Sequence, residues 1–158
     1  MRHSMRNSPT SQKMSITGGY KLLAPIYRQI AEHRGYFQKE AELLEDAFNL
    51  SNIPKGAKIL DAACGTGDVA CILHYKGYKV YASDGSMDML KQWNGDTSHI
   101  RRQLCDWTKL NQVFNKFGLF DAVYMLCNSI AHASPETIRD KILKRVFSGL
   151  RKGGIFVF

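Results

Sequence analysis

The sequence predicts an α/β domain with a doubly wound, mostly parallel sheet of about five strands, and three observations predict it. Over residues 57–158, short apolar segments alternate with segments of helical periodicity, as in repeated βαβ units. The apolar segment Lys58–Asp61 runs into the small-residue loop Ala62–Gly67, where a ligand could approach the backbone closely. The segment Phe120–Leu126 is almost entirely apolar, which is typical of a central strand in a parallel sheet.

The first 19 residues form a basic segment that we expect to be a disordered leader. It contains Arg2, Arg6 and Lys13, many Ser and Thr, and no acidic residue, a composition that organellar transit peptides also have. No apolar run approaches the roughly 20 residues that span a bilayer, and the N-terminus lacks the apolar segment of a secretory signal. We therefore expect a cytoplasmic protein without membrane contact.

Residues 20–56 are expected to form an N-terminal helical lid. Apolar residues at helical spacing predict a short helix over Tyr20–Ile30, kinked at Pro25. A longer amphipathic helix is predicted over Tyr36–Leu50, and the turn residues of Ser51–Gly56 end it.

The α/β domain proper is expected to span residues 57–158 and to open with a βαβ unit. This unit comprises the strand Lys58–Asp61, a helix over Asp68–Tyr75 and the strand Lys79–Ser83. Asp84 closes the second strand, and Ser86 can cap a further short helix. The apolar residues of that helix are Met87, Met89, Leu90 and Trp93.

The second half of the domain is predicted to contain three more strands. They are Arg101–Cys105, Phe120–Leu126 and Ile155–Phe158, the last one following a turn at Gly153–Gly154. Ser134-Pro135-Glu136 has the cap, the N1 proline and the early acid of a helix start. The buried stripe of that helix is predicted to be Ile138, Ile142, Leu143, Val146, Phe147 and Leu150.

The formal net charge of +8 raises the question of a nucleic-acid partner. Much of the excess lies in the leader and in Arg139–Lys152, where basic and apolar residues alternate as on a solvated helix face. We therefore do not expect nucleic acid as a partner. The cysteines at 64, 71, 105 and 127 and the five histidines are dispersed, which favours reduced thiols and no metal site.

Two ligand classes use a small-residue loop after the first strand and an acid after the second: dinucleotides, and nucleosides such as S-adenosylmethionine. In both, a carboxylate at Asp84 can accept hydrogen bonds from the ribose hydroxyls. The dinucleotide pattern G-x-G-x-x-G is not met, because its glycine positions are Ala63, Gly65 and Asp68. A pyrophosphate would also meet like charge at Asp68. The sequence therefore favours a cofactor without phosphates.

These residues resemble the class I S-adenosylmethionine-dependent methyltransferases, with Ile59–Gly67 as their first motif. The other motifs are Asp84–Leu90, Cys105–Trp107, Phe120–Val123 and Leu150–Gly154, in the order and spacing of the family and together covering about residues 20–158. The resemblance implies the Rossmann-like methyltransferase fold and S-adenosylmethionine as cofactor. Within the family, residues 61–67 and 126–132 look most like glycine N-methyltransferases and glycine/sarcosine-methylating relatives.

The resemblance also implies a set of site residues. Asp84 would hold the ribose, Asp106 and Trp107 the adenine, and Arg34 the cofactor carboxylate. The full set of implied cofactor-binding residues is Tyr20, Tyr27, Arg34, Ala63, Gly65, Gly67, Asp84, Ser86, Met89, Asp106, Trp107, Leu126 and His132.

No nucleophile is expected, because the methyl group of a sulfonium is already activated and the protein supplies alignment and exclusion of water. Asn128 would face the substrate, and Asn128 and His132 are the candidate catalytic residues. We expect methyl transfer to a small-molecule acceptor, an amine or an acid. The alternatives are a catalytically silent S-adenosylmethionine-binding module and, third, an RNA methyltransferase.

Members of the family continue past the strand Ile155–Phe158 with a further helix and usually two strands, so the sequence is expected to lack the usual last strands. Three explanations stay open: a C-terminally truncated chain, a second chain that completes the sheet, or a free-standing cofactor-binding domain. Because a bare edge strand exposes unpaired backbone, we expect a homo-oligomer or a partner chain to cover it.

Overall fold

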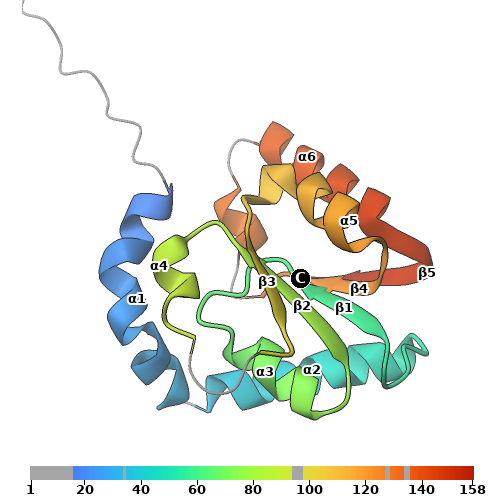
Figure 1. Ribbon diagram of the computed structural model, residues 1–158, viewed down its shortest axis with the longest axis horizontal. Helices are drawn as coiled ribbons and strands as arrows, with labels where there is room; N and C mark the ends of the chain where they lie inside the picture. Colours follow the sequence, from blue (N-terminus) through green and yellow to red (C-terminus); the bar gives the residue numbers. More distant parts are fainter. Residues whose placement is uncertain (1–15, 34, 94–97, 127–128, 134–135) are drawn as a thin grey trace, which may run out of the picture.

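Five parallel strands occupy the centre of the computed structural model, which describes residues 16–33, 35–93, 98–126, 129–133 and 136–158, with the backbone alone for residues 16–20 and 131–132 (Figure 1). The strands within these ranges are β1 (Lys58–Asp61), β2 (Lys79–Asp84), β3 (Arg101–Leu104), β4 (Phe120–Tyr124) and β5 (Leu150–Val157). The helices are α1 (Ile16–Glu32), α2 (Tyr36–Leu50), α3 (Asp68–Tyr75), α4 (Met87–Leu90), α5 (Asn111–Phe117) and α6 (Glu136–Gly149). Two 3-10 turns are η1 (Trp107–Lys109) and η2 (Ser129–His132).

The strand order in the sheet is β3-β2-β1-β4-β5, and every neighbouring pair is parallel. Ile59 of β1 is in register with Val80 of β2 on one side and with Ala122 of β4 on the other. The chain therefore winds outward in both directions from β1, which confirms the predicted doubly wound fold. The switch point lies between β1 and β4, the place where such sheets bind ligands outside their carboxyl ends.

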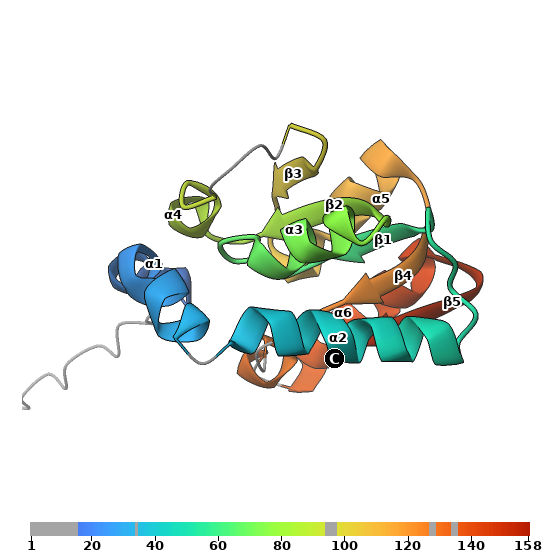
Figure 2. The ribbon, with the colours of Figure 1, turned by 90° about the horizontal axis from the view of Figure 1, so that it is seen from below.

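Helices cover both faces of the sheet: α2 and α3 lie on one face, and α5 and α6 on the other (Figures 1 and 2). Side chains alternate along each strand, so the two faces contribute to two separate cores. Ile59 packs with Phe48 of α2 and Leu73 of α3, whereas Leu60 packs with Phe114 of α5 and Val146 of α6. Burial on both faces explains why the strands are almost entirely apolar.

The predicted lid separates into two helices with different roles. The buried side of α2, Phe37, Ala41, Leu44 and Phe48, packs into the same core as β1 and α3, so α2 is part of the helical layer. Only α1 lies apart, next to α4 at the side of the sheet (Figures 1 and 2). It starts at Ile16 and continues through Pro25, and is thus longer at both ends than predicted. Residues 1–15 of the predicted leader lie outside the described residues.

Strand β5 begins earlier than predicted. The predicted turn at Gly153–Gly154 lies inside the strand, because the pairing with β4 shifts from Phe120–Leu150 to Ala122–Ile155. Gly153 has a φ of 80°, a left-handed value that favours glycine at such a bulge. The two glycines that indicated a turn therefore accommodate extra residues within a paired strand.

The predicted buried stripe of α6 is only partly correct. Ile142 and Val146 are fully buried together with Gly149, but Leu143 and Phe147 are 39% and 79% exposed. The buried side of α6 is the one that meets α5, a helix that the sequence analysis did not assign: the Phe114 ring fills the space beside Gly149. A signal for α5 was present, since Leu110, Val113, Phe114 and Phe117 have helical spacing.

Two further findings concern sequence-level expectations. None of the helices in the described part of the chain is long and apolar enough to span a bilayer. Cys64, Cys71 and Cys105 are free thiols, and Cys127 lies outside the described residues.

The contact between α5 and α6 provides a stability test. In Gly149→Ala, the new Cβ would lie 2.3 Å from the Phe114 ring, so the ring or the helix must move. Overpacking of this kind costs about 1–3 kcal/mol, which urea unfolding would measure as a decrease in the free energy of unfolding. The neighbouring substitution Ser148→Ala, on the exposed side of α6, is the control and should change it by less than about 1 kcal/mol. Equal stabilities of the two variants would contradict this packing.

Candidate functional site

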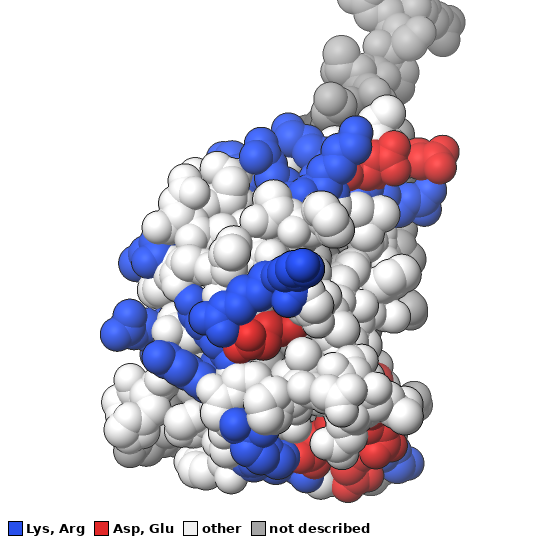
Figure 3. All heavy atoms as spheres, turned by 90° about the vertical axis from the view of Figure 1, so that its right-hand side faces the viewer, with Lys and Arg blue, Asp and Glu red and all other residues white. Residues whose placement is uncertain are grey.

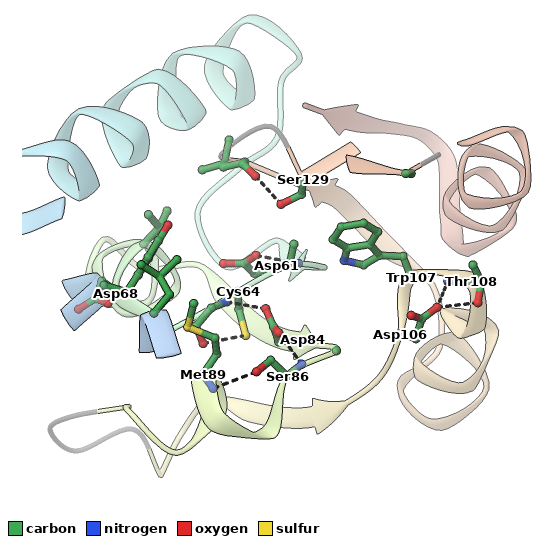
Figure 4. Close-up of a pocket in the computed structure, with 18 of the residues that line it drawn as sticks. Asp61, Cys64, Asp68, Asp84, Ser86, Met89, Asp106, Trp107, Thr108 and Ser129 are labelled. Carbon is green, nitrogen blue, oxygen red and sulfur yellow. Dashed lines mark hydrogen bonds between the residues drawn. The ribbon is translucent and has the colours of Figure 1, made fainter. Parts of the chain in front are cut away.

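A cavity of about 330 Å³ opens at the carboxyl ends of β1, β2 and β4. Its volume lies within the range of small-molecule sites. Figure 4 shows that Asp61 and Asp84 come from the ends of two different strands. The described residues that line it are Leu23, Tyr27, Phe37, Asp61, Ala63, Cys64, Gly65, Asp68, Val69, Asp84, Gly85, Ser86, Met89, Asp106, Trp107, Thr108, Leu126, Ser129, Ala133 and Ile138.

Asp84, the last residue of β2, connects two of the walls. Its Oδ2 accepts the Gly65 N–H at 2.8 Å, and its Oδ1 accepts the Ser86 N–H at 2.7 Å. Burial raises the pKa of Asp84, and these two hydrogen bonds oppose the rise. A carboxylate held in one orientation by two backbone donors still has lone pairs for further donors, such as ligand hydroxyls.

The loop after β1 brings its backbone next to the cavity. The Cys64 N–H donates to the Ser83 carbonyl at 3.0 Å, and Gly65 adopts a left-handed φ of 52°. With no side chain at Gly65 and only a methyl group at Ala63, this wall is formed mainly by main-chain atoms. A flat ligand can therefore lie directly on the loop.

The wall opposite the loop is formed by the segments that follow β2 and β3. Ser86 caps α4 by accepting the Met89 N–H at 3.3 Å, and the Met89 side chain is 2% exposed. Asp106 caps η1 by accepting bonds from the backbone N–H and the hydroxyl of Thr108, at 2.8 and 2.6 Å. The Trp107 indole extends into the space between these residues and Asp61 (Figure 4).

The remaining walls come from distant parts of the sequence. Leu23 and Tyr27 of α1 and Phe37 of α2 contribute apolar surface on one side, and Leu126 and Ser129 after β4 on the other. The Ser129 hydroxyl donates to the Leu126 carbonyl at 2.6 Å, which fixes the backbone at the end of β4.

Asp61, at the end of β1, is the most deeply buried acid of the cavity and is 4% exposed. Burial raises its pKa to about 7, and the Asp84 carboxylate adds to the rise. Two groups oppose this rise in pKa: the Ala63 N–H, which donates to the Asp61 carboxyl group at 3.3 Å, and the nearby Tyr124 hydroxyl. The hydroxyl does not have regular hydrogen-bond geometry with the carboxyl group. Asp61 is therefore the acid of this cavity whose charge changes near neutral pH.

Most of the described residues predicted to bind the cofactor line this cavity. They are Tyr27, Ala63, Gly65, Asp84, Ser86, Met89, Asp106, Trp107 and Leu126. Gly67 does not line it and instead packs against the Trp93 ring outside the loop. Arg34 and Asn128 lie outside the described residues, as do the side chains of Tyr20 and His132.

The sequence analysis missed several lining residues. Asp61 was identified as the end of a strand but not as a site residue, although its place directly before the loop was a signal. Leu23 and Phe37 were assigned only to helix faces, and their sequence pattern does not distinguish a core from a cavity wall. Thr108 and Ser129 stand close to predicted site residues, but nothing in their own pattern identifies them.

One premise of the ligand prediction changes. Asp68 was expected to repel a pyrophosphate, but its carboxylate is paired with the Arg28 guanidinium at 2.7 Å. Asp68 therefore no longer presents an uncompensated charge to a ligand. The preference for a cofactor without phosphates then depends on the acidic character of the whole cavity.

The order of the strands, the backbone loop and the acid at the end of β2 agree with a comparison against known families. A family model described as a methyltransferase domain matches residues 59–154. The chain belongs to the class I S-adenosylmethionine-dependent methyltransferases. The match begins in β1 and ends in β5, so it includes β2, β3 and β4 and parts of the two other strands.

Individual relatives align with different fractions of this chain. The Bacillus subtilis protein YqeM is 29% identical over 139 residues, which are 88% of this chain and 54% of YqeM. A glycine/sarcosine N-methyltransferase from Halorhodospira halochloris is 38% identical over 104 residues, 63% of this chain and 38% of the relative. The X-ray structure of the sugar N-methyltransferase KedS8 from Streptoalloteichus has a TM-score of 0.69 at 24% identity, which shows a common fold. It is matched over 99% of this chain and 59% of KedS8.

These percentages also show how this chain compares in length with its relatives. It spans between about two fifths and three fifths of the length of the relatives just described.

The charges of the cavity fit S-adenosylmethionine, the cofactor of the family. Among the described lining residues are the four carboxylic acids Asp61, Asp68, Asp84 and Asp106, and no Lys or Arg. S-adenosylmethionine carries a sulfonium and an ammonium group against one carboxylate, so an acidic cavity favours it electrostatically. A dinucleotide pyrophosphate would instead need donors or cations, which these lining residues do not supply.

The raised pKa of Asp61 predicts a pH-dependent stability. Between the unfolded pKa of about 4 and the folded value of about 7, the folded chain keeps a proton that the unfolded chain has released. The contribution of Asp61 to stability therefore falls as the pH rises through this window. Urea unfolding at pH 5 and pH 8 should show that the wild type loses up to about 3 kcal/mol relative to Asp61→Asn. Parallel pH profiles of the two proteins would contradict the assignment.

Proposed function

We propose that this protein transfers the methyl group of S-adenosylmethionine to the nitrogen of a small-molecule amine. The observation that carries the proposal is the acidic cavity at the switch point, where Asp84 and the backbone of Gly65 are joined by a hydrogen bond. S-adenosylmethionine supplies an activated methyl group on a sulfonium, so the protein needs to bind, orient and desolvate rather than to provide a nucleophile.

We assign the roles of the binding residues as follows. Asp84 accepts hydrogen bonds from the ribose hydroxyls, because its carboxylate is already oriented by two backbone donors. Trp107 and Met89 provide apolar contact to the adenine, with Asp106 beside it. Ala63 and Gly65 face the methionine part, where the Asp61 carboxyl group lies near the cationic groups.

Water is excluded by the apolar residues of the N-terminal helices. Leu23 and Tyr27 project from α1 over the loop, and Phe37 closes the wall below them. The Cys64 thiol is buried with a raised pKa, so it stays protonated and does not compete as a nucleophile. Tyr20, Arg34, Asn128 and His132 remain proposed contributors to the site.

An amine acceptor is supported by two lines of reasoning. The acidic lining attracts a protonated amine, which must release one proton before its nitrogen lone pair attacks the methyl carbon and displaces S-adenosylhomocysteine. Two of the relatives described above are named as N-methyltransferases, one of glycine and sarcosine and one of a sugar, and both names specify transfer to nitrogen. The identity of the amine is left to direct assay.

An RNA acceptor is less well supported, because basic residues of the strands lie at the end of the sheet opposite the cavity. Lys58, Lys79, Arg101 and Arg151 lie at or near the first residues of their strands, whereas the cavity lies at the carboxyl ends. Figure 3 shows Lys and Arg spread over the face at the amino ends of the strands. Two of these side chains already have partners within the protein: Arg151 pairs with Asp121 at 2.8 Å, and Lys58 donates to the Phe117 carbonyl.

The role of Asp84 can be tested by calorimetric titration with S-adenosylmethionine. In Asp84→Asn, hydrogen bonds to a charged acceptor are lost, which are worth about 1.5–3 kcal/mol, so the affinity should fall roughly 10- to 100-fold. The matched control Asp46→Asn removes an exposed carboxylate from α2 and should bind like the wild type. Unchanged affinity of Asp84→Asn would contradict the proposed position of the ribose.

Methyl transfer itself needs a second measurement. With labelled S-adenosylmethionine, we expect incorporation into one of a panel of glycine, sarcosine and amino sugars, and none into the corresponding carboxylic acids that lack an amine. Tight binding of the cofactor without transfer to any amine would instead identify the chain as a silent binding module. Transfer to RNA but not to small amines would identify the third alternative.

A further inference from the structure

Arg28 of α1 contacts two other segments of the molecule, residues 66–68 and Gln92, with one guanidinium group. Its Nε donates to Asp68 Oδ1 at 2.7 Å, and its Nη2 to Asp68 Oδ2 at 3.3 Å. Nη2 also donates to the Thr66 carbonyl at 3.1 Å, and Nη1 to the Gln92 carbonyl at 2.9 Å. The Arg28 side chain is only 18% exposed, and that of Asp68 16%. We call Arg28, Thr66, Asp68 and Gln92 the Arg28 cluster.

Of the Arg28 cluster, Asp68 lines the cavity, whereas Arg28, Thr66 and Gln92 do not. The carbonyl of Gly65 also has a partner that does not line the cavity, the Trp93 Nε1–H at 3.1 Å. The Trp93 ring fills the space beside Gly67 so closely that a Cβ at Gly67 would lie 1.9 Å from it. The carbonyl groups of Gly65 and Thr66 are thus bonded from outside, while the N–H of Gly65 is bonded from inside by Asp84.

The backbone of this loop is fixed by two side chains that are remote in sequence. Arg28 comes from the helix that covers the cavity, and Trp93 from the segment after α4. Tyr27, the residue next to Arg28, lines the cavity. A movement of α1 away from the loop would therefore break the bonds of Arg28 and withdraw Tyr27 from the site in the same step.

We infer that Arg28 is a positioning residue for the cofactor, which acts through Asp68 and the Thr66 carbonyl to hold the glycine loop and the covering helix α1 as one unit. The inference rests on the proposed cofactor site and adds a residue to it. Arg28 itself does not line the cavity; its effect on the cofactor comes from fixing the main chain of the loop and the place of Tyr27.

The geometry requires arginine rather than any cation. A planar guanidinium presents donors in several fixed directions, and here they reach one carboxylate and two carbonyl groups. An ammonium group at the same place is a point charge on a flexible stem and can keep the pairing with Asp68 without both carbonyl contacts. Removing the charge leaves Asp68, at the wall of the cavity, with only the Thr66 hydroxyl as a hydrogen-bond partner among those described.

The inference is tested with Arg28→Met, Arg28→Lys and the control Arg139→Met, which removes an exposed guanidinium from α6. For each protein, calorimetry gives the dissociation constant for S-adenosylmethionine, and hydrogen exchange gives the protection of α1 and of residues 65–68 with and without cofactor. Urea unfolding gives the global stability. Arg28→Met should bind at least ten-fold more weakly, with fast exchange in both segments, Arg28→Lys should be intermediate, and the control should match the wild type.

A double-mutant cycle with Asp68→Asn tests the route of the effect. If Arg28 acts through Asp68, the double variant should bind no more than about two-fold more weakly than Arg28→Met alone. Fully additive losses would overturn this route.

Three further outcomes decide the inference. Wild-type affinity in Arg28→Met would overturn it while leaving the proposed function intact. A loss of affinity that follows an equal loss of global stability, without selective exchange in α1 and the loop, would also overturn it. If the wild type itself does not bind S-adenosylmethionine, the proposed function fails, whatever the exchange of α1 in Arg28→Met.

Discussion

The hydrogen bonds of the Asp84 carboxylate connect the parts on which the site depends. One oxygen holds the Gly65 N–H of the loop after β1, and the other holds the Ser86 N–H at the start of α4. The segments that follow these two adjacent parallel strands therefore border the same cavity in fixed relative positions. Without this link, the loop and the start of α4 would be held together only by the sheet and by the hydrogen bonds of Trp93 and Arg28.

The sheet supplies the frame for that link. Because β1, β2 and β4 are parallel and in register, their carboxyl ends fall at one edge, and Asp61, Asp84 and Leu126 come together there. Apolar packing on both faces keeps the strands in place, so the polar residues need not contribute to the core. The site can then contain the buried Asp61, with its raised pKa, beside the half-buried Asp68 and Asp84.

Local patterns predicted several strands and the doubly wound fold correctly. Lys58–Asp61, Arg101–Leu104 and the apolar run from Phe120 were predicted nearly to the residue. Sequence-based prediction failed where the neighbours of a residue belong to a distant segment of the chain. Phe147 and Leu143 have the right spacing for burial but lie outside the contact with α5, and the glycines at 153 and 154 form a bulge because β4 pairs with the residues around them.

The amino-acid sequence by itself determined the fold class, the loop and the acid that follows β2, because these follow from local periodicity, from small residues and from their spacing. The tertiary structure alone decided which side of the loop each residue occupies. Gly67 faces Trp93 rather than the cavity, Asp68 is paired with Arg28, and α2 belongs to the helical layer while α1 covers the site. These relations join residues about 25 to 65 positions apart. Such contacts are fixed by packing and by the geometry of donors and acceptors, and no local pattern in the sequence encodes them.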